Sequence, residues 1–109
     1  MVEQMSNEMT EIKKNDQWTA CVNAWLDSRR SPNTRRAYRI AIDDFLHCES
    51  TSLQDAVPSH FVEWKNNMVA RGLKGSSINA RLGSLNSLYQ FAETEEKMSL
   101  NNPVNIRRI

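Results

Sequence analysis

Apolar side chains recur at intervals of three or four residues in four separate segments of this 109-residue chain. This spacing places them along one side of an α-helix, so each segment is predicted to be an amphipathic helix with one face to bury. The whole chain holds three glycines and three prolines, which is too few for the many turns of a short-stranded protein. The predicted fold class is therefore all-α, a small four-helix bundle.

Capping residues give the expected boundaries of the first two helices. The first helix is predicted to start near Asn15 or Asp16, whose side chains can accept hydrogen bonds from the free amides of a first turn, and to end within residues 28–31. The second starts at Ser31, because the proline that follows is tolerated in a first helical turn. It is expected to end near Cys48, before a polar run.

The other two helices carry similar signals. The third is predicted to open at Pro58 or Ser59 and to stop at Gly72, which readily adopts the left-handed conformation of a helix end. A cap at Ser76 or Ser77 would start the fourth, which frays near residue 93.

Short connections organise these helices into two packed helical hairpins, one from the first pair and one from the second. A longer loop over residues 49–57 joins the hairpins. We therefore expect a flexible arm at residues 1–14, a four-helix domain at residues 15–100 and the start of a linker at residues 101–109.

The net charge of +1 hides an alternating pattern. Residues 27–39 carry +4 and residues 65–81 carry +4, whereas residues 43–64 carry −5. If the fold brings the two basic segments to one face, that face would bind anions. Otherwise they are ordinary solvated helix surfaces.

Residue types suited to catalysis or metal binding are poorly placed. His47 and His60 have no partner at metal-ligand spacing, and no glycine-rich phosphate-binding loop occurs. Asp43 and Asp44 are neighbours, whose side chains point about 100° apart on a helix, so we interpret both as solvated. We expect no catalytic residue, no metal and no cofactor in this chain.

Two further features concern the compartment. No apolar run approaches the length of a membrane helix, and the first residues do not form a secretory signal. The two cysteines are far apart in sequence. We therefore expect a cytoplasmic protein that does not contact a membrane.

Three short motifs resemble one protein family. The segment SPNTRRAY at residues 31–38, with Phe-Leu at residues 45–46, resembles the second helix of the core-binding domain of tyrosine recombinases and phage-type integrases. The segment GLKGSSINARL at residues 72–82 resembles the connection to the fourth helix and its first turns. Asn-Pro at residues 102–103 is similar to the pair that precedes the interdomain linker.

The resemblance implies a SAM-like four-helix domain that, with a separate catalytic domain, clamps duplex DNA during integration and recombination. In that family the nucleophilic tyrosine belongs to the catalytic domain. Tyr38 and Tyr89 match helical core positions instead, so this chain is expected to bind DNA without reacting with it. The full-length protein would assemble with further recombinase protomers into a tetramer, while the fragment alone would be a monomer.

The expected DNA contacts lie at the starts of the second and fourth helices. Arginine and lysine would neutralise phosphates, and serine would hold a phosphate near free helix amides. Asparagine and arginine also have the donors to read base edges, and which of them does so stays open. The predicted contacts are Thr34, Arg35, Arg36, Arg39, Lys74, Ser76, Ser77, Asn79 and Arg81. The alternative is a helical protein-interaction module without nucleic acid, which an exposed apolar stripe would mark.

Overall fold

A computed structural model describes residues 17–107 of the chain. A helical segment at residues 17–27 is followed by α2 (Pro32–Cys48), α3 (Pro58–Ala70) and α4 (Gly75–Thr94). No strand occurs in this part of the chain, so the all-α prediction is confirmed. The predicted arm at residues 1–14 and the predicted first cap lie outside the described residues.

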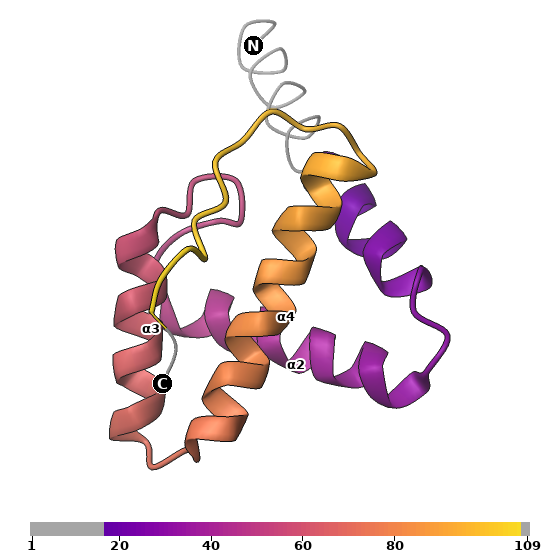
Figure 1. Ribbon diagram of the computed structural model, residues 1–109. Helices are drawn as coiled ribbons and strands as arrows, with labels where there is room; N and C mark the ends of the chain where they lie inside the picture. The colour runs from indigo at the N-terminus through magenta and orange to yellow at the C-terminus, as the bar shows by residue number, and fades with distance from the viewer. Residues whose placement is uncertain (1–16, 108–109) are drawn as a thin grey trace, which may run out of the picture.

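The helices form two hairpins that pack across each other (Figure 1). The turn at residues 71–74 joins α3 to α4, and these two helices run in opposite directions. In the other hairpin, the ring of Trp25 stacks on that of Tyr38, with centroids 4.1 Å apart and planes 4° from parallel. Among α2, α3 and α4, the most extensive packing is between α2 and α4, which cross. The predicted bundle of two hairpins is therefore the observed architecture.

Most predicted helix ends match the structure, and one does not. Ser31 caps α2, with its hydroxyl accepting a hydrogen bond from the Thr34 amide at 3.4 Å. Gly72 has a φ of +80°, as expected of a glycine that ends a helix. The predicted cap of α4 at Ser76 or Ser77 is wrong, because Lys74 is the extended residue before this helix.

A backbone hydrogen bond in the first turn of α4 explains this early start. The Ile78 amide donates to the carbonyl of Lys74 at 3.0 Å, which closes the first helical turn ahead of both serines. No side chain caps this helix. Both serines therefore lie within the first turn of α4 and expose their side chains.

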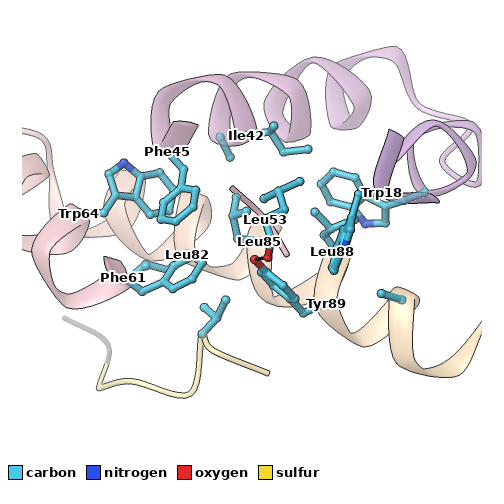
Figure 2. Packing of buried hydrophobic residues seen from close by; sticks show 14 of the residues in the cluster. Trp18, Ile42, Phe45, Leu53, Phe61, Trp64, Leu82, Leu85, Leu88 and Tyr89 are labelled. Carbon is cyan, nitrogen blue, oxygen red and sulfur yellow. Dashed lines mark hydrogen bonds between the residues drawn. The ribbon is translucent and has the colours of Figure 1, made fainter. Parts of the chain in front are cut away.

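Aromatic rings fill the core at the point where α2, α3 and α4 meet (Figure 2). Phe45 is fully buried and stacks on Phe61 at a centroid distance of 4.4 Å. Its ring also meets the edge of Trp64 at 5.2 Å. Towards the other end of the core, the buried Tyr89 hydroxyl donates to the carbonyl of Leu53 at 2.6 Å, and burial raises the pKa of this phenol. These aromatic residues are therefore core residues, as their helical spacing predicts.

The segment after α4 packs back onto the domain. Val104 is 2% exposed and belongs to the same hydrophobic core. Asn102 Nδ2 donates to Asn86 Oδ1 on α4 at 2.7 Å, and Lys65 Nζ on α3 donates to the carbonyl of Arg107 at 3.0 Å. The boundary at residue 100 stays a prediction, but Val104 contributes to the stability of the four-helix unit.

Glu49, directly after α2, provides a test of stability against pH. Burial raises the pKa of this carboxyl, and the hydrogen bond and the charge of Glu63 raise it further, while the charge of His60 opposes them. The folded state therefore prefers the protonated form. The stabilisation that protonated Glu49 gives the folded state is complete below the ordinary pKa of about 4.3. It is lost as the pH rises through the raised pKa of Glu49.

We therefore expect Glu49→Gln to raise the melting temperature at pH 7 and to change it less at pH 4. Thermal unfolding followed by circular dichroism at both pH values measures this difference. Glu93→Gln, at an exposed position on α4, is the matched control. Equal shifts for the two variants at pH 7 would contradict the expectation.

Candidate nucleic-acid interface

The first group of predicted contacts lies at the start of α2. Three arginines there have exposed side chains, and Thr34 is half-buried in the same turn. With Asn23 and Asp27 of the preceding helical segment, the arginines line an open surface hollow of about 530 Å³. The three arginines are Arg35, Arg36 and Arg39. The structure thus brings the predicted contacts of α2 together and adds two polar neighbours.

Packing on the opposite side of α2 leaves two of these arginines exposed to solvent. Ala41, Ile42 and Phe45 form the buried face of the helix, so Arg36 and Arg39 are left on the solvent side. Burial of that apolar face is what orients the arginines, because residues one turn apart share a side of a helix.

A hydroxyl on α4 fixes the same end of α2. Ser87 Oγ accepts a hydrogen bond from Trp25 Nε1 at 3.2 Å and another from Arg29 Nη2 at 3.3 Å. The hydroxyls of Ser87 and Tyr38 lie 3.4 Å apart. One small side chain therefore ties the helical segment at residues 17–27 and α2 to α4.

The second group of predicted contacts lies at the start of α4. Lys74, Ser76 and Ser77 have exposed side chains, and Asn79 is half-buried. The first turn of a helix leaves backbone amides without helical partners and carries a positive partial charge. This turn therefore combines a lysine, two hydroxyls and amide donors on the surface, a set that suits an anion.

Arg81 differs from the other predicted contacts, because it is already paired. Its Nη1 lies 3.0 Å from Asp44 Oδ2, and 28% of its side chain is exposed. The same carboxylate oxygen accepts from Trp64 Nε1 at 2.9 Å and pairs with Arg71 Nη2 at 2.7 Å. The prediction that Asp44 is a solvated residue is therefore wrong, since Trp64, Arg71 and Arg81 all direct N–H groups at its carboxylate.

This pairing changes the acidity of Asp44. Burial raises the pKa of the carboxyl, but hydrogen bonds from Arg71 and Trp64, together with the charges of Arg71 and Arg81, outweigh it. The pKa therefore lies below its ordinary value, and the carboxylate stays charged at neutral pH. Its stabilising contribution is present above the ordinary pKa of about 3.9 and is lost as the pH falls through the lowered value.

The two predicted groups lie on crossing helices and do not form one cluster. Arg35 precedes Asp44 by nine residues, which is roughly 13 Å of helix rise. The ion pair between Asp44 and Arg81 then connects the second half of α2 to the first half of α4. That both groups face one DNA duplex stays a prediction.

Residues 17–107 contain neither a metal-binding cluster nor a membrane-spanning helix. No group of three or more histidine, cysteine or carboxylate side chains is arranged to hold a metal ion there. The helices in this range are also too short or too polar to cross a bilayer.

Comparison with known proteins identifies the fold family. Residues 22–96 match the family described as phage integrase, N-terminal SAM-like domain. The chain belongs to this family. A tyrosine recombinase of Synechococcus elongatus is 36% identical over 80 aligned residues, which cover 62% of this chain and 25% of the relative. The chain thus spans about a quarter of the length of this curated relative, and no solved structure matches it.

Membership confirms the predicted family. The motifs at residues 31–46 and 72–82 lie inside the matched residues, whereas Asn-Pro at residues 102–103 lies outside them. In this integrase domain, the starts of both α2 and α4 lie inside the matched residues 22–96. The segment that packs back onto the domain after residue 96 lies outside them.

Sequence reasoning missed three polar residues of this integrase domain. Arg71 is a member of the basic segment at residues 65–81, but nothing in the motifs assigns it a role. Asn23 and Asp27 lie on a different helix from the arginines whose hollow they line. No short-range pattern links these residues to their partners, because each contact joins separate helices.

Proposed function

We propose that this chain is the DNA-binding domain of a site-specific tyrosine recombinase and that it holds duplex DNA against the starts of α2 and α4. The observation that carries the proposal is the hollow at α2, where three exposed arginines converge. Among residues 17–107, Asp27 is the only acidic side chain that lines this hollow. A cationic surface of this kind suits the phosphate backbone, which dominates the affinity of proteins for DNA.

The start of α4 supplies the second contact. Lys74 with the hydroxyls of Ser76 and Ser77 surrounds the positive end of the helix, where a phosphate oxygen can accept several hydrogen bonds. These groups would position the domain on the duplex without selecting a sequence. Asn79 is the residue of this turn whose amide can read adenine in the major groove.

The remaining steps of recombination belong to the full-length protein. The curated relative is a tyrosine recombinase about four times as long as the segment aligned with it, so we infer that strand cleavage and joining reside outside the matched region. Tyr89 is 2% exposed and Tyr38 is stacked on Trp25, which makes both poor candidates for a nucleophile. We infer duplex DNA and the other protomers of a recombinase tetramer as partners, in the cytoplasm.

One observation favours the alternative of a protein-interaction module. Val62 and Val69 lie seven residues apart on α3, and their side chains are 40% and 52% exposed. Seven residues correspond to two helical turns, so both valines share one face. Such a face would bind an apolar partner surface without any role for the arginines.

A titration with a short generic duplex at two salt concentrations separates the two functions. We expect amide shifts in the NMR spectrum to concentrate at the starts of α2 and α4. The dissociation constant should lie at about 10⁻⁴ to 10⁻⁶ M near physiological salt and rise steeply with added salt. No shifts at low salt, with protein and duplex well above that range, would contradict DNA binding.

A further inference from the structure

Asp44 joins three helices through one carboxylate. Its Oδ1 accepts a hydrogen bond from Arg71 Nη1 at 3.1 Å, and its Oδ2 accepts from Arg71 Nη2 at 2.7 Å. The same Oδ2 pairs with Arg81 Nη1 at 3.0 Å and accepts from Trp64 Nε1 at 2.9 Å. Arg71 follows α3 directly and Arg81 lies on α4, so this single side chain of α2 brings two guanidinium groups together.

The two guanidinium groups retain free charge and donors. One carboxylate balances one of the two positive charges, which leaves the cluster with a net charge of +1. Each guanidinium has five N–H donors, of which Asp44 takes two from Arg71 and one from Arg81. The Arg71 and Arg81 side chains are 38% and 28% exposed, whereas that of Asp44 is 14% exposed. The carboxylate is therefore covered, and the cationic groups face outward.

The cluster adjoins the proposed DNA contacts. Arg71 precedes Lys74 by three residues, and both belong to the turn between α3 and α4, at the lower end of the molecule in Figure 1. Arg81 is one helical turn after Ser77 on α4. The paired guanidinium groups and the start of α4 are therefore neighbours on the chain and in space.

We propose that Asp44 is a positioning residue that holds Arg71 and Arg81 side by side for the phosphate backbone, and that Arg71 is a further DNA contact. The inference rests on the proposed function. An arginine side chain is long and flexible, and fixing it before binding removes an entropic cost of ordering it on the DNA. A carboxylate that grips Arg71 through both of its oxygens provides this fixation.

The direction in which DNA affinity changes when one negative charge is removed tests the proposal. DNA is a polyanion, so removal of a carboxylate from a DNA-binding surface ordinarily strengthens binding. Positioning by Asp44 predicts the opposite, because loss of its charge releases two arginines. We expect Asp44→Asn to weaken duplex binding by about tenfold, the factor that corresponds to loss of one charge-assisted hydrogen bond.

Asp43→Asn is the matched control. It makes the same chemical change one residue away on α2, where the side chain is exposed and forms no ion pair within residues 17–107. We expect this variant to bind a generic duplex as tightly as the unchanged chain or slightly more tightly. Affinities are measured by fluorescence anisotropy at low salt, below the melting temperature of every variant, and are corrected for the folded fraction.

Arg71→Lys provides a second variant that keeps the charge and leaves Asp44 paired with Arg81. Lysine cannot bind a carboxylate through a planar fork, so we expect affinity to fall severalfold although the net charge is unchanged. Unchanged affinity for Arg71→Lys, or Asp44→Asn binding as tightly as Asp43→Asn, would overturn the inference while leaving the proposed function intact. Absence of binding by the unchanged chain would instead contradict the proposed function itself.

Discussion

Replacing Phe45 by alanine is expected to lower the free energy of unfolding by about 3–5 kcal/mol. The Phe45 side chain is fully buried and stacks on Phe61 at 4.4 Å. Its loss would leave a cavity where α2 meets α3, and Trp64 would lose its edge contact at 5.2 Å as well. Because small domains have a total free energy of unfolding of only about 5–15 kcal/mol, this variant should lose a large part of its stability.

Urea unfolding followed by circular dichroism measures the loss. Leu46→Ala, at the next position of α2, is the control, since this side chain is 40% exposed. We expect the control to change stability by about 0.5 kcal/mol, as surface substitutions usually do. Similar losses of stability for the two variants would contradict the burial of Phe45 between α2 and α3.

Removing Arg36 and Arg39 together is expected to have the largest effect on DNA binding. Both are exposed and line the hollow at the start of α2. Each phosphate contact contributes about 0.9 to the slope of log affinity against log salt, so the double alanine variant should reduce this slope by about two. Neither side chain belongs to the core, so the melting temperature should change little.

The measurement is a series of fluorescence anisotropy titrations from low to moderate salt. Lys97→Asn is the control for charge, because it removes one positive charge after α4, and asparagine tolerates the positive φ of 52° found there. The control should leave the salt slope nearly unchanged. An unchanged slope in the double arginine variant would favour the protein-interaction module. Arg81 is left out of this test because its ion pair with Asp44 links its loss to stability.

Local sequence patterns were sufficient to predict most of the fold. Ile42 and Phe45 are three residues apart, the spacing of one helix face, and both are buried in α2. Ser31 caps that helix, as its position before proline predicts. Gly72 ends the region of α3 with the expected positive φ. These features depend on residues within one or two helical turns, where spacing and capping chemistry decide the backbone conformation.

The candidate site was only partly predictable. Arg35, Arg36 and Arg39 could be named from sequence, because they are basic residues close together in the first turns of a single helix. Their neighbour Asp27 could not be named, since it reaches the hollow through packing of one helix against another. The first residue of α4 was also not predictable from sequence. Its serines carry a capping signal, but the chain is already helical at Gly75.

The sequence by itself determined the four helical segments, their buried faces and the two stretches of positive charge. Only the tertiary structure decided the environment of Asp44. As one of two adjacent acids on a helix it has the pattern of a solvated residue, yet Trp64 on α3, Arg71 directly after α3 and Arg81 on α4 all contact it. The physical reason is that a helical pattern specifies which side of a helix is buried, whereas the partners on that side depend on how the hairpins cross.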